Sequence, residues 1–455
     1  MERIDGEPMM VDMVAAACYV ASSPARVIQG DGALADHHSV PDYHDFAASM
    51  ARLVLFRVRI EKCDGEMMTM VVYGTKVVLL GATVCGLVSS GVGVSLSRGL
   101  RGSFVVRSVP VGKTPQALAV DPNTGRVFVA NGDSNTVSVL DARTGAVIRT
   151  TPVGQTPQAV AVDRVTGRAF VVNSSSNTVS VLAASTGRVV RTVAVGKEPV
   201  DVATDEVSHR AFVISDVADT VSVLDTRTGA VIRSVRVGAA PRDLAVDPGV
   251  NRVFVLDSGT AAPNATDVPR NPVSMLDART GAVLRTFLVG QIGMVTPGGL
   301  AVDDRTHHLF VANSDSNNVM MVDTRTGTVL RTLPIAQSIY IATAPRAHHA
   351  FVLTANTAAL TVVDTRTGMI VRSTTIPSTP LQAAVDDQRG RVVITSDDLK
   401  TGAHRVSMVD ARTGTLLHAA PAAMSPAEVV IDAGTARAFV DETDANAVVV
   451  LDTGV

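Results

Sequence analysis

The sequence of 455 residues contains no tryptophan, and aromatic residues make up only 3% of it. Without tryptophan there is no WD-type repeat, which needs its Trp-Asp pair, and no tryptophan on which a quinone cofactor could stack. Single-stranded nucleic acids are bound in basic grooves with aromatic platforms, and the formal net charge of −3 argues against such a groove. Nucleic acid is therefore not an expected partner.

Cysteine is also scarce, since Cys18, Cys63 and Cys85 are the only three. Everything after Cys85 must fold without disulfides or thiolate metal ligands. No glycine-rich phosphate loop stands between a strand and a helix, which excludes the common nucleotide sites. What the sequence has in abundance is apolar mass, 46% of the residues, mostly valine, alanine and leucine.

A repeat of about 44 residues covers most of the chain. The tract DARTG at 141–145 returns with small changes at 183–187, 225–229, 277–281, 323–327, 364–368 and 410–414, and shortened at 451–454. In the first unit, apolar runs at 115–121, 127–131, 136–141 and 146–150 are bounded by turn residues and show no helical period. Each unit is therefore predicted to form four antiparallel strands, a to d, as in a propeller blade.

Eight strand-a cores can be counted, beginning at residues 118, 160, 202, 244, 300, 341, 383 and 429. The eighth unit lacks its outer strand, but residues 104–112 have the form of one and precede the first strand a. We therefore predict an all-β fold for 104–455: a β-propeller of eight four-stranded antiparallel blades, closed by the N-terminal strand 104–109 completing the last blade. The sixth unit lacks the strand-a aspartate, which leaves seven blades plus an irregular segment as the alternative.

The units resemble the YVTN-type β-propeller repeat of YncE-like bacterial and archaeal surface or periplasmic proteins. The resemblance rests on the tracts FVAN (128–131 and 310–313), FVVN (170–173) and SNTVSVLD (134–141), together with the DxRTG turns, and it covers 104–455. Members of this family usually close with seven blades, against the eight counted here. The resemblance implies a repeat protein outside the cytoplasm and is not specific for any chemistry.

The first hundred residues lie outside the repeat. Residues 1–66 stay unassigned, as a disordered N-terminal extension or a misassigned start. Residues 77–96 carry no charge and are long enough for a spanning helix, and from Met70 the layout is that of a secretory signal peptide. We therefore predict a signal peptide or membrane anchor in 67–100, with 77–96 as the tether, and a periplasmic, cell-surface or secreted protein; a buried apolar segment is the alternative.

The candidate ligand residues occupy positions where units depart from the repeat. Asp201, Asp243 and Glu428 open their strands a and are expected at one mouth of the central channel, with Arg242 beside them. Converging carboxylates can hold Ca²⁺ or activate water, whereas a hydrated rim of scattered charges needs no ligand.

Two loops also break the repeat, and specificity is most readily built in such loops. The b–c loop of unit four, 257–274, is ten residues longer than that of unit one and carries Asp267 and Arg270. The loop of unit seven, 396–405, is four residues longer and carries Asp397 and His404. On the opposite face, His308 and His349 are weak candidates for a transition-metal site, with exposed turn histidines as the plainer interpretation.

No complete catalytic constellation can be assembled from the aligned positions, and no catalytic residue is assigned. The uniform polar residues at the ends of strand b and the DxRTG aspartates are interpreted as turn formers. We therefore expect a non-enzymatic, monomeric platform outside the cytoplasm that binds an unknown protein or small molecule and needs no cofactor. The alternative is a metal-dependent lactonase-type hydrolase with a carboxylate-lined channel, for which Ca²⁺ would be the metal.

Overall fold

A computed structural model of the chain divides it into two units, Met1–Arg101 and Gly102–Val455. The structure describes the strands between residues 54 and 89, and residues 104–454 apart from 259–270, 290–297, 315, 356, 377, 399–400 and 423–425.

The first unit contains a four-stranded antiparallel sheet in sequence order: β1 (Val54–Arg57), β2 (Thr69–Tyr73), β3 (Lys76–Gly81) and β4 (Val84–Ser89). The uncharged stretch 77–96 thus contributes strands in its described part, where one interpretation of the sequence required a single helix. No helix among the described residues is long and apolar enough to cross a membrane. The remainder of 1–66 and of the predicted signal or anchor segment lies outside the described residues.

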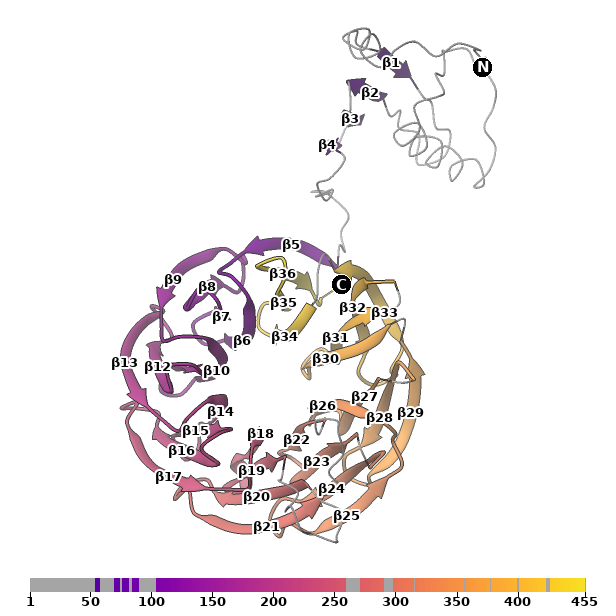
Figure 1. Ribbon diagram of the computed structural model, residues 1–455. Coiled ribbons are helices and arrows are strands. Elements are labelled where there is room, and N and C mark those ends of the chain that lie inside the picture. Colours follow the sequence, from indigo (N-terminus) through magenta and orange to yellow (C-terminus); the bar gives the residue numbers. More distant parts are fainter. Residues whose placement is uncertain are drawn as a thin grey trace. The chain divides into compact units, whose positions relative to one another are not determined.

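The second unit is a ring of eight four-stranded sheets (Figure 1). Blades one to four are β6 (Pro115–Asp121), β7 (Arg126–Asn131), β8 (Thr136–Asp141), β9 (Val147–Pro152); β10 (Pro157–Asp163), β11 (Arg168–Asn173), β12 (Thr178–Ala183), β13 (Arg188–Ala194); β14 (Pro199–Asp205), β15 (Arg210–Ser215), β16 (Thr220–Asp225), β17 (Val231–Arg236); and β18 (Pro241–Asp247), β19 (Arg252–Asp257), β20 (Asn271–Asp277), β21 (Val283–Val289). A short 3₁₀ turn, η1 (Pro248–Val250), joins β18 to β19.

The other four blades repeat this order. They are β22 (Leu300–Asp303), β23 (His308–Asn313), β24 (Asn318–Asp323), β25 (Val329–Leu333); β26 (Ser338–Ala344), β27 (His349–Thr354), β28 (Ala359–Asp364), β29 (Met369–Thr375); β30 (Thr379–Asp386), β31 (Arg391–Asp398), β32 (Ala403–Asp410), β33 (Leu416–Ala422); and β34 (Pro426–Asp432), β35 (Arg437–Glu442), β36 (Ala447–Asp452), β5 (Val105–Pro110). The sixth blade is complete although Ala344 replaces the strand-a aspartate, so the prediction of eight blades is confirmed and the seven-blade alternative is wrong.

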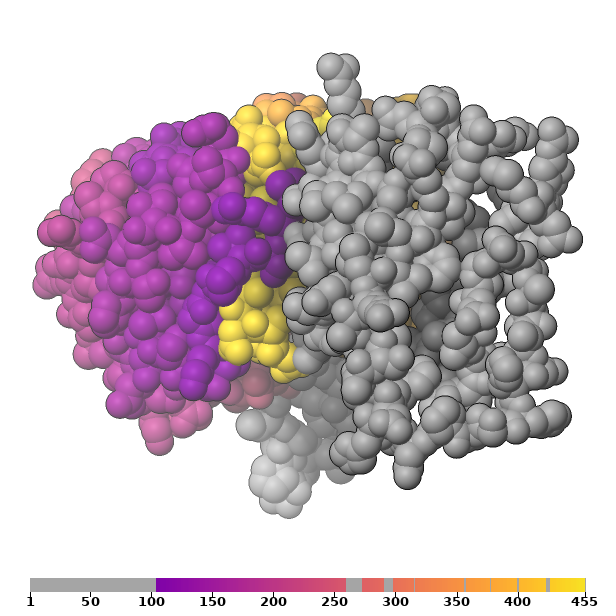
Figure 2. Space-filling model, turned by 90° about the horizontal axis from the view of Figure 1, so that it is seen from above, coloured from indigo at the N-terminus to yellow at the C-terminus, as the bar shows by residue number. Residues whose placement is uncertain are grey.

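The ring closes as the sequence predicts. Strand β5 pairs antiparallel with β36, with Val109 opposite Val448 and Arg107 opposite Val450. Figure 2 shows the first residues of this unit, in indigo, lying against the C-terminal residues, in yellow. Because β5 pairs with β36, the facing edges of these two strands are both hydrogen-bonded. Closing the ring in this way removes two free strand edges.

The core runs between blades rather than within them. In seven of the eight blades one phenylalanine near the middle of strand b is fully buried: Phe128, Phe170, Phe212, Phe254, Phe310, Phe351 and Phe439. In blade seven Val393 takes this place. Phe170 of blade two packs with Val213 and Leu224 of blade three. Both faces of each sheet are therefore covered, which explains why strands b and c read as continuous apolar runs.

The DxRTG tracts are turns, as predicted. In the first, Asp141 Oδ1 accepts hydrogen bonds from the backbone N–H and the hydroxyl of Thr144, at 2.8 and 2.9 Å. Partial burial raises the pKa of Asp141, but these donors outweigh it and leave the pKa below its usual value. Gly145 follows with a φ of 68°, in the left-handed region that favours glycine.

The arginine of the outer strand also contacts this turn. In three blades its guanidinium donates to a threonine carbonyl in the turn of the next blade: Arg191 to Thr228 at 3.3 Å, Arg233 to Thr280 at 3.1 Å, and Arg285 to Thr326 at 2.8 Å. The turn thus joins strands c and d of its own blade and also accepts a hydrogen bond from the outer strand of the blade before it.

Candidate functional site

Two faces of the ring can be distinguished by their hydrogen bonds. The b–c and d–a connections meet on one, which we call the loop face; there Thr114 donates through its hydroxyl to Asp133 Oδ2 at 2.6 Å. The a–b and c–d turns meet on the other, the turn face, where the Ala142 N–H donates to the Gly125 carbonyl at 2.9 Å. The strands a lie innermost, around the axis of the ring (Figure 1), and their first residues lie at the loop-face end of this axis, where the sequence analysis placed the channel mouth.

The structure brings the three predicted channel carboxylates together. Burial, and after it the nearby charge of Asp243, raises the pKa of Asp201 to about 8. Burial also raises the pKa of Asp243 to about 6, against hydrogen bonds from the N–H groups of Leu300 and Leu244. For Glu428, burial and then the charge of Asp441 raise the pKa well above its usual range.

Tyr340, which opens strand a of blade six, shares this environment. Burial raises the pKa of its hydroxyl, and the charges of Glu428, Asp243 and Asp201 add to the effect. The end of the channel is therefore a half-buried acidic cluster with one phenol, in which protonated carboxyl groups are favoured.

Two of these carboxylates connect neighbouring blades. Asp243 Oδ2 accepts a hydrogen bond from the N–H of Leu300 in blade five, and Glu428 Oε2 accepts one from Leu118 in blade one, both at 2.6 Å. Asp201 instead accepts from the N–H of its own neighbour Val202, at 2.7 Å. The channel carboxylates thus stabilise the scaffold by accepting hydrogen bonds from backbone N–H groups.

Asp441 is a member of the cluster that the sequence analysis missed. It is fully buried on β35, and its Oδ1 accepts from the N–H groups of Ala427 and Glu428, at 3.2 and 2.5 Å. Burial raises its pKa to about 7. The signal was present in the alignment, because the aligned position is apolar in the first six blades and threonine in blade seven: Ala130, Val172, Ile214, Leu256, Ala312, Leu353 and Thr395.

These carboxylates do not fit the calcium site that their sequence positions suggest. A hard cation needs several oxygens turned toward one point, yet Asp243 and Glu428 already direct an oxygen to a backbone N–H. Across the described part of the chain, no three His, Cys, Asp or Glu side chains come together as metal ligands.

The remaining candidates of the loop face are dispersed. Arg242 is exposed and forms an ion pair with Asp216 at 3.5 Å, while its Nε donates to Ser258 at 3.2 Å. Asp397 and His404 face each other across the extended β31–β32 hairpin, with Oδ1 and Nδ1 2.7 Å apart. Asp267 and Arg270 lie outside the described residues.

The two histidines of the turn face bind backbone rather than each other. The Nδ1–H of His308 donates to the Thr365 carbonyl at 2.7 Å, and that of His349 donates to the Ala411 carbonyl at 3.1 Å. Each imidazole therefore joins its blade to the next one, and the two do not form a metal pair.

The polar ends of strand b are structural, as interpreted from the sequence. Asn131 Nδ2 donates to the hydroxyls of Thr136 and Ser138, at 3.1 and 3.0 Å, and so holds the start of strand c. Asp257 takes this position in blade four, where burial raises its pKa to about 7 and Ser274 donates to it at 2.9 Å.

The fold and the channel together define a β-propeller of eight blades with an acidic cluster at one end of its axis. The chain belongs to the YNCE-like beta-propeller family, whose model matches residues 152–454. The resemblance stated from the repeat is thereby confirmed. No curated protein sequence matches the chain.

Solved structures share the fold at low identity. Hydrazine synthase of Kuenenia stuttgartiensis has 17% identity and a TM-score of 0.52, with 79% of this chain and 100% of that chain covered. The computationally designed Ika8 protein has 16% identity and a TM-score of 0.61, covering 77% and 100%. BamB from Moraxella catarrhalis has 17% identity and a TM-score of 0.57, covering 76% and 97%. At these identities the likeness concerns the fold alone.

Proposed function

We propose that this propeller is a non-enzymatic binding platform that works outside the cytoplasm and presents its loop face to a protein or small-molecule ligand. The observation that carries the proposal is the placement of its departures from the repeat. The strands of the β31–β32 hairpin have eight residues each, against six in β7 and β8, and the hairpin carries the Asp397–His404 pair. The inserted loop of blade four joins β19 to β20, which is a b–c connection of the same face.

The channel carboxylates support the same proposal by what they already do. A general base needs a free oxygen within reach of a substrate proton, and a nucleophile needs an activating base beside it. Asp243 and Glu428 are instead bonded to the backbone of neighbouring blades. The extended loops are therefore the departures from the repeat that remain available for a ligand.

A loop graft tests the platform. Replacing residues 258–271 by the four residues 132–135 of blade one removes the insertion and keeps the hairpin connection, so the fold should survive while ligand binding is lost. The matched control replaces the a–b turn 433–436 of blade eight, on the turn face, by residues 122–125. Cross-linking in the producing cells followed by mass spectrometry should recover a partner with the wild type and the control graft only, with equal thermal unfolding of all three.

Equal recovery of the same partner by both grafts would count against the loop face. Stoichiometric metal in the purified protein that is lost on Asp201→Asn would instead support the lactonase-type hydrolase.

Export is tested separately. Fusing residues 67–110 to a reporter that is active only outside the cytoplasm should give an active reporter, because the proposed signal or anchor lies in 67–100. A fusion of residues 104–110 alone serves as the control and should stay inactive. A silent 67–110 fusion, with a cytosolic reporter on the same segment still active, would contradict export.

A further inference from the structure

The exposed apolar side chains of the propeller are gathered on its outer strands. Fifteen of the 18 large apolar side chains that are exposed in the described part of the propeller lie there. Ten of these fifteen belong to blades four to seven: Val283, Leu284, Leu288, Val329, Leu330, Met369, Ile370, Val371, Leu416 and Leu417. Single exposed apolar side chains are ordinary, but a group on adjacent strands indicates a contact surface. The outer strands of blades four to seven are therefore a candidate surface for a partner.

A hollow lies in the middle of this surface, at the outer seam between blades five and six. Its volume is about 210 Å³, and it is lined by residues 331–334 of blade five and 368–370 of blade six. Leu333 is buried beneath it, whereas Met369 and Ile370 are 59% and 44% exposed. A cavity of about 150 Å³ accepts a benzene ring, so this hollow has room for one apolar side chain.

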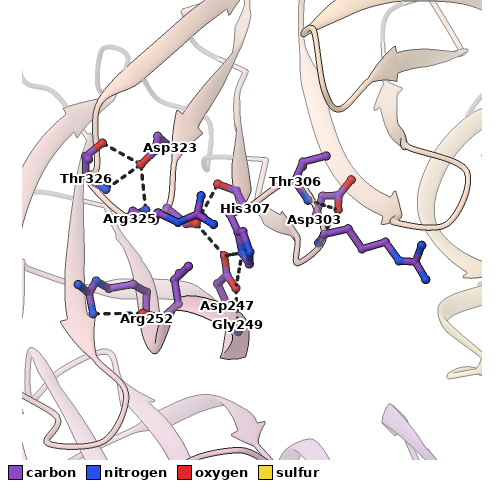
Figure 3. A network of polar contacts seen from close by, with 12 residues as sticks. Asp247, Gly249, Arg252, Asp303, Thr306, His307, Asp323, Arg325 and Thr326 are labelled. Atoms are coloured by element: carbon purple, nitrogen blue, oxygen red, sulfur yellow. Dashed lines mark hydrogen bonds and ion pairs between the residues drawn. The ribbon is translucent and has the colours of Figure 1, made fainter.

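The seam before this one is closed on its outer side. As in blades two and three, the arginine of the outer strand of blade four donates to a threonine carbonyl of the next blade. Here Arg285 reaches Thr326 at 2.8 Å. The turn that contains Thr326 is held by Asp323, which accepts from the N–H groups of Arg325 and Thr326 (Figure 3). The arginine thus fastens its blade to the next one.

The arginine of blade five does not close its seam in this way. Arg331 has the same position on β25, but it has no hydrogen bond or ion pair with any described residue. Its stem lies over the turn of blade six, because a Cβ on Gly368 would be 2.9 Å from Arg331 Cδ. A guanidinium with a positioned stem and unused N–H groups therefore borders the hollow.

Strand β25 also has an open edge. It is the last strand in its sheet and pairs with β24 alone. The N–H and C=O groups of such an outer edge are a template on which an extended segment can add a further strand. In β25 this edge adjoins both the hollow and Arg331.

The charge of the surface selects the occupant. Arg331 is the middle residue of β25, so a second copy that paired its own β25 symmetrically would set two guanidinium groups opposite each other, which is destabilising. Arg285 and Arg372 on the neighbouring outer strands are exposed and add positive charge. The turn carboxylates Asp323 and Asp364 accept hydrogen bonds within their own turns. The surface therefore suits a segment with acidic side chains.

We propose that the outer seam between blades five and six is a docking site for an extended, acidic segment of a partner protein. The segment adds a strand to the open edge of β25, places one apolar side chain in the hollow and directs its carboxylates to Arg331. The site lies on the perimeter of the ring and is separate from the loop face. It would hold a partner while the loop face stays accessible to the ligand proposed above.

A synthetic peptide tests the site on the whole protein. The probe has seven residues, with glutamate at each odd position, valine at the second and sixth, and phenylalanine at the centre; its ends are blocked and it carries a fluorophore. The control peptide has lysine in place of each glutamate. Fluorescence anisotropy at low ionic strength should show binding of the acidic peptide to the wild type, and binding of the lysine peptide weaker by roughly tenfold or more.

Charge reversal of one exposed residue locates the binding. Arg331→Glu should weaken binding of the acidic peptide by roughly tenfold and strengthen that of the lysine peptide. Arg233→Glu is the matched control, because Arg233 is exposed at the same position of blade three, and it should change neither affinity. Ile370→Ser should weaken the acidic peptide by roughly threefold and leave the preference for acidic side chains intact. These side chains are exposed, so thermal unfolding should show that each variant folds.

Three outcomes would overturn the proposal. The first is equal binding of the two peptides by the wild type, or binding of neither, and the second is an equal effect of Arg331→Glu and Arg233→Glu. The third is a wild-type dimer in sedimentation that Ile370→Ser dissociates, since a second copy would then cover the surface. The loop graft that replaces 258–271 should bind the acidic peptide as the wild type does, so this proposal and the loop-face proposal fail separately.

Discussion

Removal of residues 1–110 is expected to open the ring, whereas removal of 1–102 should leave it closed. The two truncations differ only by Ser103, Phe104 and strand β5. That strand covers the edge of β36, and Phe104 and Val109 are buried against the eighth blade and its neighbours. Exposing these apolar side chains, together with the strand pairing lost, should lower the free energy of unfolding by about 5 kcal/mol.

The measurement is urea unfolding of both truncated proteins, with size-exclusion chromatography to detect association through the exposed edge of β36. The shorter protein should unfold at lower urea and should self-associate, because an unpaired strand edge is a template for pairing. Coincident unfolding curves would contradict the role of β5 as the closing strand.

The stability of the propeller is expected to fall as the pH rises from 5 to 8. Asp201, Asp257 and Asp441 have pKa values of about 8, 7 and 7, raised above those of the unfolded chain by burial. The folded protein therefore holds protons that the unfolded chain has already released above about pH 4. Each such group favours folding fully below the unfolded pKa and ceases to do so as the pH passes its folded pKa, with a slope on the order of 1.4 kcal/mol per pH unit and proton.

Single substitutions identify the protons. Asp201→Asn and Asp441→Asn should each flatten the plot of unfolding free energy against pH, because the neutral amide has no proton to lose. Asp444→Asn, an exposed carboxylate of the same blade as Asp441, is the control and should leave the slope unchanged. A wild-type plot that is level between pH 5 and 8 would disprove the assignment.

The architecture was predictable because one turn chemistry recurs in six of the eight units. The DxRTG tract needs an aspartate to accept the threonine N–H and a glycine with positive φ, and these demands are local, so they are visible in the sequence. The closing strand could be predicted for the same reason: residues 104–109 have the pattern of an outer strand, and β5 (Val105–Pro110) is that strand. The sheet β1–β4 has no such repeated pattern; the sequence analysis left residues 1–66 unassigned and predicted a signal peptide or membrane anchor in 67–100, so the sheet was not predicted.

The candidate site was only partly predictable, because it depends on contacts between blades. The position of Asp243 at the start of strand a could be counted from the repeat, but its hydrogen bond to Leu300 needs the geometry of the neighbouring blade. Likewise His308 was considered for metal binding, while its Nδ1 reaches a carbonyl 57 residues further along the chain. Asp441 precedes the last residue of strand b, at a position that is apolar in six of the other blades, so the polar positions that the repeat shares do not include it.

The pairing of β5 with β36 also orders events during biosynthesis. Blades one to seven can each be completed as soon as their own four strands have left the ribosome, since their strands follow one another in the chain. Strand β5 leaves first and finds its partner only when residues 447–452 have been made, so it waits with an open edge through almost the whole translation of the unit. Ring closure is therefore late, because it joins two strands that lie far apart in the sequence. During translation, β5 is the strand of the propeller that is longest exposed to pairing with a wrong partner.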